Sequence, residues 1–247
     1  MKIKKITVSK FKRFSDLTIS EIPETAKLIV LVGPNGSGKT SIFEALNHWY
    51  KNNGFGVMEH HLHMEESKSY FEKKDGNILG QNWYQDRVKI NFHNNVTYSK
   101  EDVKGKFYFR TAYRNEADFT ISSLAKQNSP TEKLRFKTLM HNDITVSENY
   151  QRLIAKTLVG VYNSSNDNKT VEQLREELIG KIKKSLTLIF DDLTLSSIGD
   201  PMSNGSFYFK KGLSENFHYK NLSAGEKSVF DLILDLIIKS SYYKDGI

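Results

Sequence analysis

Gly33-Pro34-Asn35-Gly36-Ser37-Gly38-Lys39-Thr40 is the stretch that decides the fold, because it fits the pattern G-x-x-x-x-G-K-[ST]. Residues 27–32, apolar after Lys27, precede it as a strand would, and residues 41–50 follow it with helical spacing. In such a unit, glycines let backbone N–H groups turn toward phosphates, and the helix N-terminus adds its positive end. A glycine-rich turn that matches by chance is the alternative, which this context disfavours. We therefore predict that the chain binds a nucleoside triphosphate.

The residue types assign roles within this phosphate-binding loop, or P-loop. Lys39 is expected to reach the β- and γ-phosphates, and the Thr40 hydroxyl is expected to ligate Mg²⁺. The predicted binding residues are Gly33, Pro34, Asn35, Gly36, Ser37, Gly38, Lys39, Thr40 and Ser41.

Composition bounds the class of protein. The chain has 247 residues, 38% of them hydrophobic and 12% aromatic, which is enough for a sizeable core. Its length suits one large domain or one and a half. It contains no cysteine, which excludes disulfides and thiolate metal sites and agrees with a reducing cytosol. No segment reaches the roughly 18 uninterrupted apolar residues of a membrane span. We therefore predict a cytoplasmic globular protein with no membrane partner.

The charge balance favours polyanionic partners without identifying one. Lys and Arg outnumber Asp and Glu by 36 to 29, which gives a formal net charge of +7. A positive excess attracts nucleic acids at long range. Some of it is nevertheless typical of a solvated helix face, as at Lys181, Lys183 and Lys184. Charge alone therefore leaves nucleic-acid binding open.

Strand patterns surround the P-loop and recur late in the chain. Residues 52–82 lack sustained periodicity and are expected to form an excursion with one short helix near 65–73. Alternating or apolar runs predict strands at 2–9, 16–22, 27–32, 87–92, 106–112, 193–198 and 206–210.

The middle of the chain has helical character. Residues 148–161 carry helix spacing and lead into the polar loop 163–169. Thr170 and Gln173 form a capping-box pattern at the start of an amphipathic helix that is expected to run to about residue 190. The sequence thus predicts a mainly helical insertion over 115–192.

A second motif, Leu222-Ser223-Ala224-Gly225-Glu226-Lys227, lies immediately before an apolar helix predicted at 228–242. Ser223 offers a hydroxyl, Gly225 permits close approach of backbone N–H groups, and the helix that begins near Glu226 adds its dipole. These features describe an anion-binding element without a lysine clamp. An ordinary serine-capped helix is the alternative.

Taken together, the two motifs resemble those of ABC ATPases, in the S-x-G-E form of the SMC, RecF-like and OLD-like head domains. The start ITVSKFKRF, the following LTI, the Pro34-Asn35 form of the P-loop and the helical insertion resemble the same branch. The resemblance implies that ATP and Mg²⁺ bind at the P-loop. It also implies that a second head binds the γ-phosphate of that ATP through the signature motif, whose residues here are Ser223, Ala224, Gly225, Glu226 and Lys227.

The resemblance also supplies weaker site candidates. Similar heads place a basic residue of the first turn near the nucleotide, which makes Lys12 and Arg13 candidates, with a solvated turn as the equal alternative. The family's Q-loop glutamine contacts Mg²⁺ and the attacking water from a strand end. Gln127 is the first positional candidate for it and Gln85 the second. No other catalytic residue is expected in this chain.

Three other patterns are not expected to form catalytic or metal sites. Residues 186–192 (LTLIFDD) imitate the acidic Walker B strand, but they precede the signature motif, so a helix end followed by a turn explains them better. Asp231 and Asp235 share one helical face and are expected to face solvent or a partner. A histidine-rich group matches no established zinc spacing: Glu59, His60, His61, His63 and Glu65.

The family's Walker B strand, catalytic glutamate and switch histidine have no counterpart before Ile247. A fragment, a parent chain that continues into a disordered region and a natural split protein are the alternatives, of which the first two are favoured. We therefore expect residues 1–247 to bind ATP poorly or moderately and not to hydrolyse it appreciably, although the parent protein is expected to be an ATPase. ATPase turnover by this chain that Lys39→Ala abolishes would contradict that expectation.

The predicted fold is α/β, with a P-loop NTPase core, an ABC-type β-rich N-terminal lobe and a helical insertion before the signature motif. We expect the first strands, P-loop and first helix over 1–50 and an excursion with strands over 51–114. The insertion follows over 115–192, and strands, signature motif and signature helix occupy 193–247.

The predicted function is that of the ATP-binding portion of an ABC-type ATPase that dimerises on ATP and switches a nucleic-acid-directed activity. DNA repair and bacterial anti-phage defence are the expected settings. An ATP-dependent regulatory scaffold that holds a separate effector or toxin protein is the alternative, and a membrane-transporter ATPase is disfavoured by the S-x-G-E signature. The expected partners are a second ATPase head, an effector protein or domain, and DNA.

Overall fold

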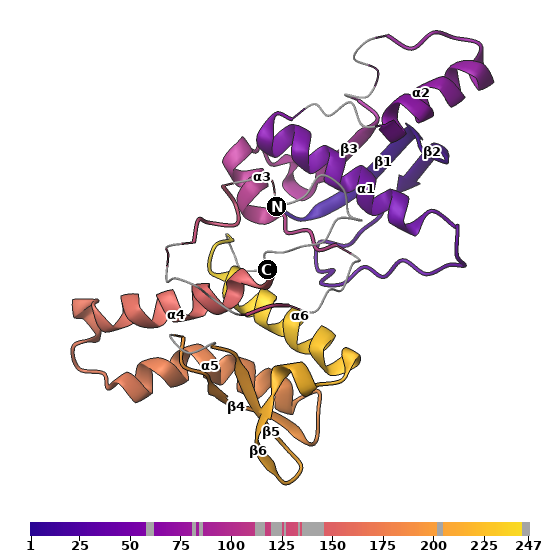
Figure 1. The fold of residues 1–247 in the computed structure, drawn as a ribbon. Coiled ribbons are helices and arrows are strands. Elements are labelled where there is room, and N and C mark those ends of the chain that lie inside the picture. Colours follow the sequence, from indigo (N-terminus) through magenta and orange to yellow (C-terminus); the bar gives the residue numbers. More distant parts are fainter. Residues whose placement is uncertain are drawn as a thin grey trace. The chain divides into compact units, whose positions relative to one another are not determined.

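A computed structural model describes residues 1–57, 62–80, 83, 86–111, 117–119, 125, 127–132, 134, 146–201 and 205–243. These residues form two compact units, Met1–Arg110 and the described residues from Thr111 onward. Both units mix helices with a small antiparallel sheet (Figure 1). Within the described part of the chain, no helix is long and apolar enough to cross a membrane.

The first unit is built on a three-stranded antiparallel sheet with the order β2-β1-β3. Its strands are β1 (Ile3–Phe11), β2 (Phe14–Ile19) and β3 (Val88–Phe92). Val8 of β1 is fully buried and pairs with Leu17 on one side and Val88 on the other. The alternation of apolar and basic residues in β1 therefore separates a core face from a solvent face, which confirms the two predicted N-terminal strands.

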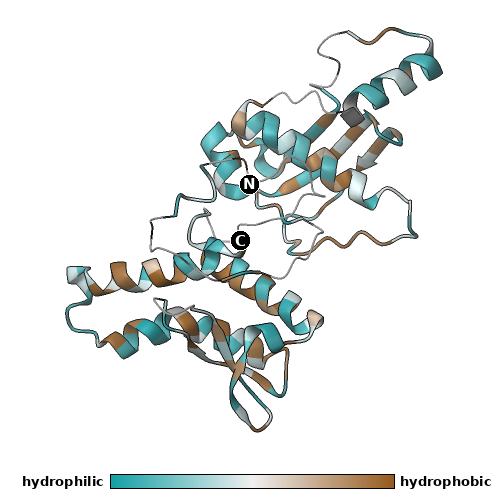
Figure 2. Cartoon of the chain, in the orientation of Figure 1, coloured by the Kyte–Doolittle hydropathy of each residue, from teal (hydrophilic) through white to brown (hydrophobic). Residues whose placement is uncertain are grey.

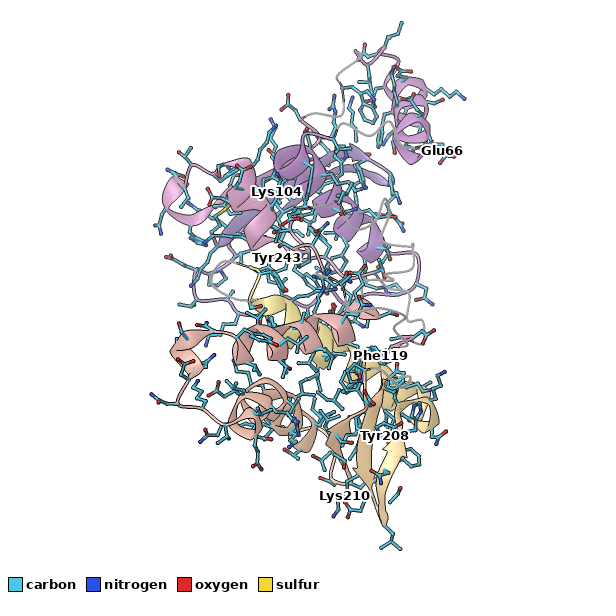
Figure 3. All side chains as sticks on the ribbon, turned by 60° about the vertical axis from the view of Figure 1, so that its left-hand side comes forward. Glu66, Lys104, Phe119, Tyr208, Lys210 and Tyr243 are labelled. Atoms are coloured by element: carbon cyan, nitrogen blue, oxygen red, sulfur yellow. The ribbon has the colours of Figure 1, made fainter. Side chains whose placement is uncertain are left out.

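Three α-helices cover this unit: α1 (Lys39–Tyr50), α2 (Leu62–Asp75) and α3 (Lys100–Lys106). The last turn of α1 continues into a π-helical turn at Lys51–Phe55. Trp49 at the end of α1 lies 5.8 Å from Phe92 and 5.3 Å from Phe107, measured between ring centroids. This aromatic cluster attaches the far end of α1 to the sheet. Figure 3 labels Glu66 on α2 and Lys104 on α3.

The strand predicted at 27–32 is not formed. These residues have no regular secondary structure, and Leu28, Val30 and Val32 are 79%, 66% and 90% exposed. Figure 2 shows the apolar character of the segment. A continuous apolar run is typical of a strand buried between neighbours in a parallel sheet. The described residues contain no strand that pairs with it, so its backbone forms no ladder of hydrogen bonds.

The strand predicted at 106–112 is also wrong over its described part. Ser99 caps α3, which extends to Lys106, and residues 107–111 have no regular secondary structure. Phe107 and Phe109 stack at 6.5 Å against each other and join the aromatic cluster of Trp49 and Tyr50. Alternation therefore identified the side chains that share a face, but the described part of the chain contains no strand that pairs with this segment.

The second unit packs three helices against another three-stranded antiparallel sheet, with the order β4-β5-β6. Its core contains Tyr150, Phe207 and Phe230, all fully buried. The ring centroids of Phe119 and Phe207 are 4.9 Å apart; Figure 3 labels Phe119. The elements are α4 (Glu148–Val161), α5 (Val171–Thr187), β4 (Leu193–Ile198), β5 (Phe207–Lys211), β6 (Ser214–His218) and α6 (Ala224–Ser240).

The helical predictions for this unit are largely confirmed. Helix α4 spans the predicted residues, and the Thr170–Gln173 capping box starts α5. Helix α5 ends at Thr187 and a turn follows, which agrees with the interpretation of 186–192 as a helix end. Helix α6 begins at Ala224, four residues before the predicted start at 228, because Ser223 caps it.

Candidate functional site

The P-loop ends in a helix N-terminus that is open to an anion. Gly36 and Gly38 have φ angles of 77° and 98°, a left-handed conformation that glycine adopts without strain. Helix α1 begins directly after Gly38, has no side-chain cap and has no acidic residue in its first turn. The first N–H groups of a helix lack intrahelical acceptors, and the first turn of α1 supplies no carboxylate to offset their positive charge. This helix end is therefore complementary to phosphate.

The side chain of Lys39 folds back over the P-loop. Its Nζ donates to the carbonyl oxygens of Gly33 at 2.7 Å and Pro34 at 2.8 Å. Residues 32–37 and Thr40 are exposed. The loop thus presents an ammonium group, backbone N–H groups and a hydroxyl together, which are the groups that hold the phosphates of a nucleotide.

The residues of this site fit Mg²⁺ only in company with phosphate. Among the described residues, no group of three or more His, Cys, Asp or Glu side chains could hold a metal ion. Mg²⁺ is commonly bound through one or two protein oxygens together with substrate phosphates, and the Thr40 hydroxyl would supply such an oxygen. Glu59, His60 and His61 lie outside the described residues, as does the side chain of His63.

The turn between β1 and β2 lies directly against the P-loop. A Cβ atom placed on Gly38 would be 2.8 Å from Cδ of Arg13 and 2.6 Å from Cζ of Phe14. Arg13 is exposed beside the loop. Lys12 has a different position, because its Nζ forms an ion pair with Glu44 of α1. Of the two predicted basic residues, Arg13 is therefore the one whose side chain contacts the loop.

The signature motif forms a preorganised helix N-terminus. Ser223 caps α6: its Oγ accepts from the Glu226 N–H at 3.3 Å, and Glu226 Oε2 accepts from the Ser223 N–H at 2.8 Å. Lys211 of β5 pairs with the other Glu226 oxygen at 2.6 Å. Burial alone would raise the pKa of Glu226, but the bonds from Lys211 and Ser223 outweigh it, so this pKa lies below its usual value. Ser223, Ala224 and Gly225 are exposed at the surface.

The signature helix carries a buried polar network that the sequence did not suggest. Asp231 and Asp235 are 4% and 0% exposed, so the prediction that they face solvent or a partner is wrong. Both Asp231 oxygens accept from the Tyr219 hydroxyl at 3.0 Å, while Asp235 forms an ion pair with Lys239. The donor that each carboxylate meets within the core offsets the desolvation cost of its burial. Asp231 thereby ties the turn before the signature motif to α6.

Gln127, the first candidate for the Q-loop glutamine, contacts helix α4. It lies in a segment without regular secondary structure, and its side-chain amide donates to Gln151 of α4. Gln85 lies outside the described residues. Neither glutamine therefore lies at a described strand end.

Four residues that shape the two motifs were not singled out from the sequence: Phe14, Glu44, Ser67 and Lys211. Each acts through a contact between elements far apart in the chain, such as the Lys12 N–H bond to Ser67 Oγ at 2.9 Å. Local patterns carry no signal for such pairs.

A phosphate-binding loop that opens a helix beside a β-hairpin defines the class of P-loop nucleotide-binding proteins. Residues 2–244 match the family model of the RecF/RecN/SMC N terminal domain, and the chain belongs to this family of ABC-type P-loop ATPases. Membership implies ATP binding, typically with Mg²⁺, and members of the family commonly dimerise. Comparisons with curated proteins and with solved structures gave no match.

Proposed function

We propose that this chain binds Mg²⁺ and ATP at Gly33–Thr40 and that two copies associate on the bound ATP. The observation that carries the proposal is the N-terminus of α1, which has no side-chain cap, no acidic residue in its first turn and Lys39 beside it. Backbone N–H groups of the loop hold the phosphates, and Lys39 moves from its carbonyl contacts to the terminal phosphates. Arg13 reaches the same phosphates from the β1–β2 turn.

The second half of the proposal concerns the signature motif. Ser223–Lys227 of one copy contact the γ-phosphate bound by the other copy. Gly225 supports this role, because a Cβ atom at this position would meet nothing within 4 Å and its φ is not positive. The packing of the described residues gives no reason for glycine at 225, whereas close approach of an external phosphate does.

The activity that this association switches is proposed to be directed at nucleic acid, in DNA repair or anti-phage defence. The formal charge of +7 supports a polyanionic partner. Anisotropy of labelled duplex DNA tests this part: binding is expected to weaken steeply between about 50 and 200 mM salt and to strengthen with ATP. Absence of binding at low salt, with and without ATP, would contradict it.

Isothermal titration calorimetry with Mg·ATP tests the nucleotide site. The Lys39→Ala variant is expected to lose at least about tenfold in affinity, since a charged hydrogen-bond donor to the phosphates is removed. Lys89→Ala is the matched control, because Lys89 is an exposed lysine on β3 of the same unit. Equal affinity of wild type and Lys39→Ala would refute ATP binding at this loop.

A further inference from the structure

The β1–β2 turn is fastened on two sides, by α1 and by α2. The Lys12 N–H donates to Ser67 Oγ of α2 at 2.9 Å, and Lys12 Nζ pairs with Glu44 of α1. Lys10 forms an ion pair with Asp75 at the end of α2. Helix α2, in the excursion between α1 and β3, therefore holds the turn beside the P-loop.

These contacts are needed because the turn has an unfavourable backbone conformation. Lys10 and Lys12 have φ angles of 49° and 48°, and neither is a glycine. A non-glycine residue in the left-handed region costs about 1 kcal/mol or more, so tertiary contacts must hold it there. The contacts of Lys12 with Ser67 and Glu44 supply that hold, and they fix the direction in which the next residue leaves the turn.

We propose that Lys12, Glu44 and Ser67 are positioning residues that hold Arg13 against the P-loop, where its guanidinium contacts the nucleotide phosphates. The inference rests on the proposed ATP binding and deepens it. In this account Lys12 positions the turn and does not contact the nucleotide. Its ammonium group is paired with Glu44, whose side chain is only 12% exposed. Helix α2 also becomes part of the nucleotide site, through the bond between Ser67 and the turn.

A double-mutant cycle measured by Mg·ATP calorimetry on the full 247-residue chain tests the inference. Arg13→Ala is expected to weaken affinity about tenfold, the loss of one charge-assisted contact. Glu44→Gln is expected to weaken it about three- to tenfold. Glu44→Gln in the Arg13→Ala background is expected to cause no further loss, because Glu44 acts through Arg13. Ser67→Ala is expected to follow the same pattern.

Charge reversal supplies a readout that misfolding would not produce. The pair Lys12→Glu with Glu44→Lys is expected to restore affinity to within about twofold of wild type, whereas each reversal alone weakens it. Glu101→Gln, which removes the Lys104 partner on α3 of the same unit, is the control and should leave affinity unchanged.

Two results would overturn the inference: unchanged affinity in Glu44→Gln, or an equal loss from Glu44→Gln with and without Arg13. If Glu44→Gln acted by a general loss of folding, it would weaken affinity equally with and without Arg13, and this outcome also counts against the inference. Failure of the underlying function is distinguishable, because the wild-type chain would then bind no ATP or bind it equally well after Lys39→Ala.

Discussion

At the residue scale, Gly38 and Gly225 are glycines for different reasons. Gly38 has φ 98°, and Arg13 and Phe14 fill the space where a side chain would lie, so both backbone conformation and packing require glycine. Gly225 lies in the first turn of α6 with open space around it. A requirement for glycine at 225 would therefore come from a molecule outside the chain.

Replacing Gly225 by alanine is expected to affect the thermal stability of the chain and its ATP-dependent self-association in opposite directions. We expect the melting temperature of Gly225→Ala to equal or slightly exceed that of wild type, since alanine favours a helix by up to about 1 kcal/mol over glycine. We expect its ATP-dependent self-association in sedimentation velocity to fall, because the methyl group obstructs the approach of phosphate. Wild-type association of this variant would argue against contact at the signature motif.

Glu226 gives the stability of the chain a defined pH dependence. Its pKa is lowered from the usual 4.5, so its contribution is present above that pH and is lost as the pH falls through the folded-state pKa. Glu226→Gln keeps the capping interaction and removes the charge. In urea denaturation, wild type is expected to exceed Glu226→Gln in stability at about pH 7, and the difference is expected to shrink as the pH falls below 4.5 and through the folded-state pKa. A difference that is constant with pH would contradict the paired state of Glu226.

The residues of both motifs were predictable because their chemistry is local: glycines, a lysine, hydroxyls and a helix start follow one another along the chain. The residues that position them were not. Glu44, Ser67 and Lys211 reach their partners across 32, 55 and 15 positions of sequence, respectively. Nothing in their immediate neighbours distinguishes them from other surface residues, so only the fold reveals them.

At the element scale, α6 shows why charge did not predict exposure. Its inner face combines Phe230 and Leu234 with Asp235 and Lys239, all fully buried, whereas Leu232 is 41% exposed. Asp235 accepts from Asn149 of α4 at 2.9 Å as well as pairing with Lys239. Burial raises the pKa of Asp235, and Lys239 opposes that rise. The polar pair thus joins two helices of the second unit.

Breaking that pair is expected to be costly. Asp235→Ala removes the carboxylate from buried Lys239 and should lower the free energy of unfolding by about 3–5 kcal/mol. The double variant Asp235→Leu with Lys239→Met should regain most of this loss, because neither charge remains in the core. Urea denaturation measures both, and Glu176→Gln, at an exposed ion pair with Lys183, should cost less than about 1 kcal/mol.

A loss in Asp235→Ala no larger than that in Glu176→Gln would contradict the burial of this pair.

Elements with complete local signals were predicted well, and those that depend on partners were not. Helix α4 has an amphipathic pattern and α5 a capping box, and both formed where expected. Residues 27–32 and 106–112 have strand-like side chains, but a strand also needs a neighbour for its backbone. The Ser99–Asp102 capping box of α3 is a local signal of a helix start, although α3 was not predicted.

At the scale of the whole molecule, the two motifs belong to different compact units. The P-loop lies in Met1–Arg110 and the signature motif in the unit that begins at Thr111. Each is anchored by contacts within its own unit, Arg13 and Phe14 for the P-loop and Lys211 and Glu226 for the signature motif. Each unit thus supplies one half of the composite nucleotide site that is proposed to form between copies.

Complementation between two variants tests the composite site most directly. In Lys39→Ala the P-loop is impaired and the signature motif is intact, and in Ser223→Arg the reverse holds. We expect sedimentation velocity with Mg·ATP to show monomers for each variant alone and dimers for their mixture, since one mixed pair contains one intact composite site. Dimers of Ser223→Arg alone, or no dimers in a mixture under conditions where wild type dimerises, would contradict ATP-dependent association through the signature motif.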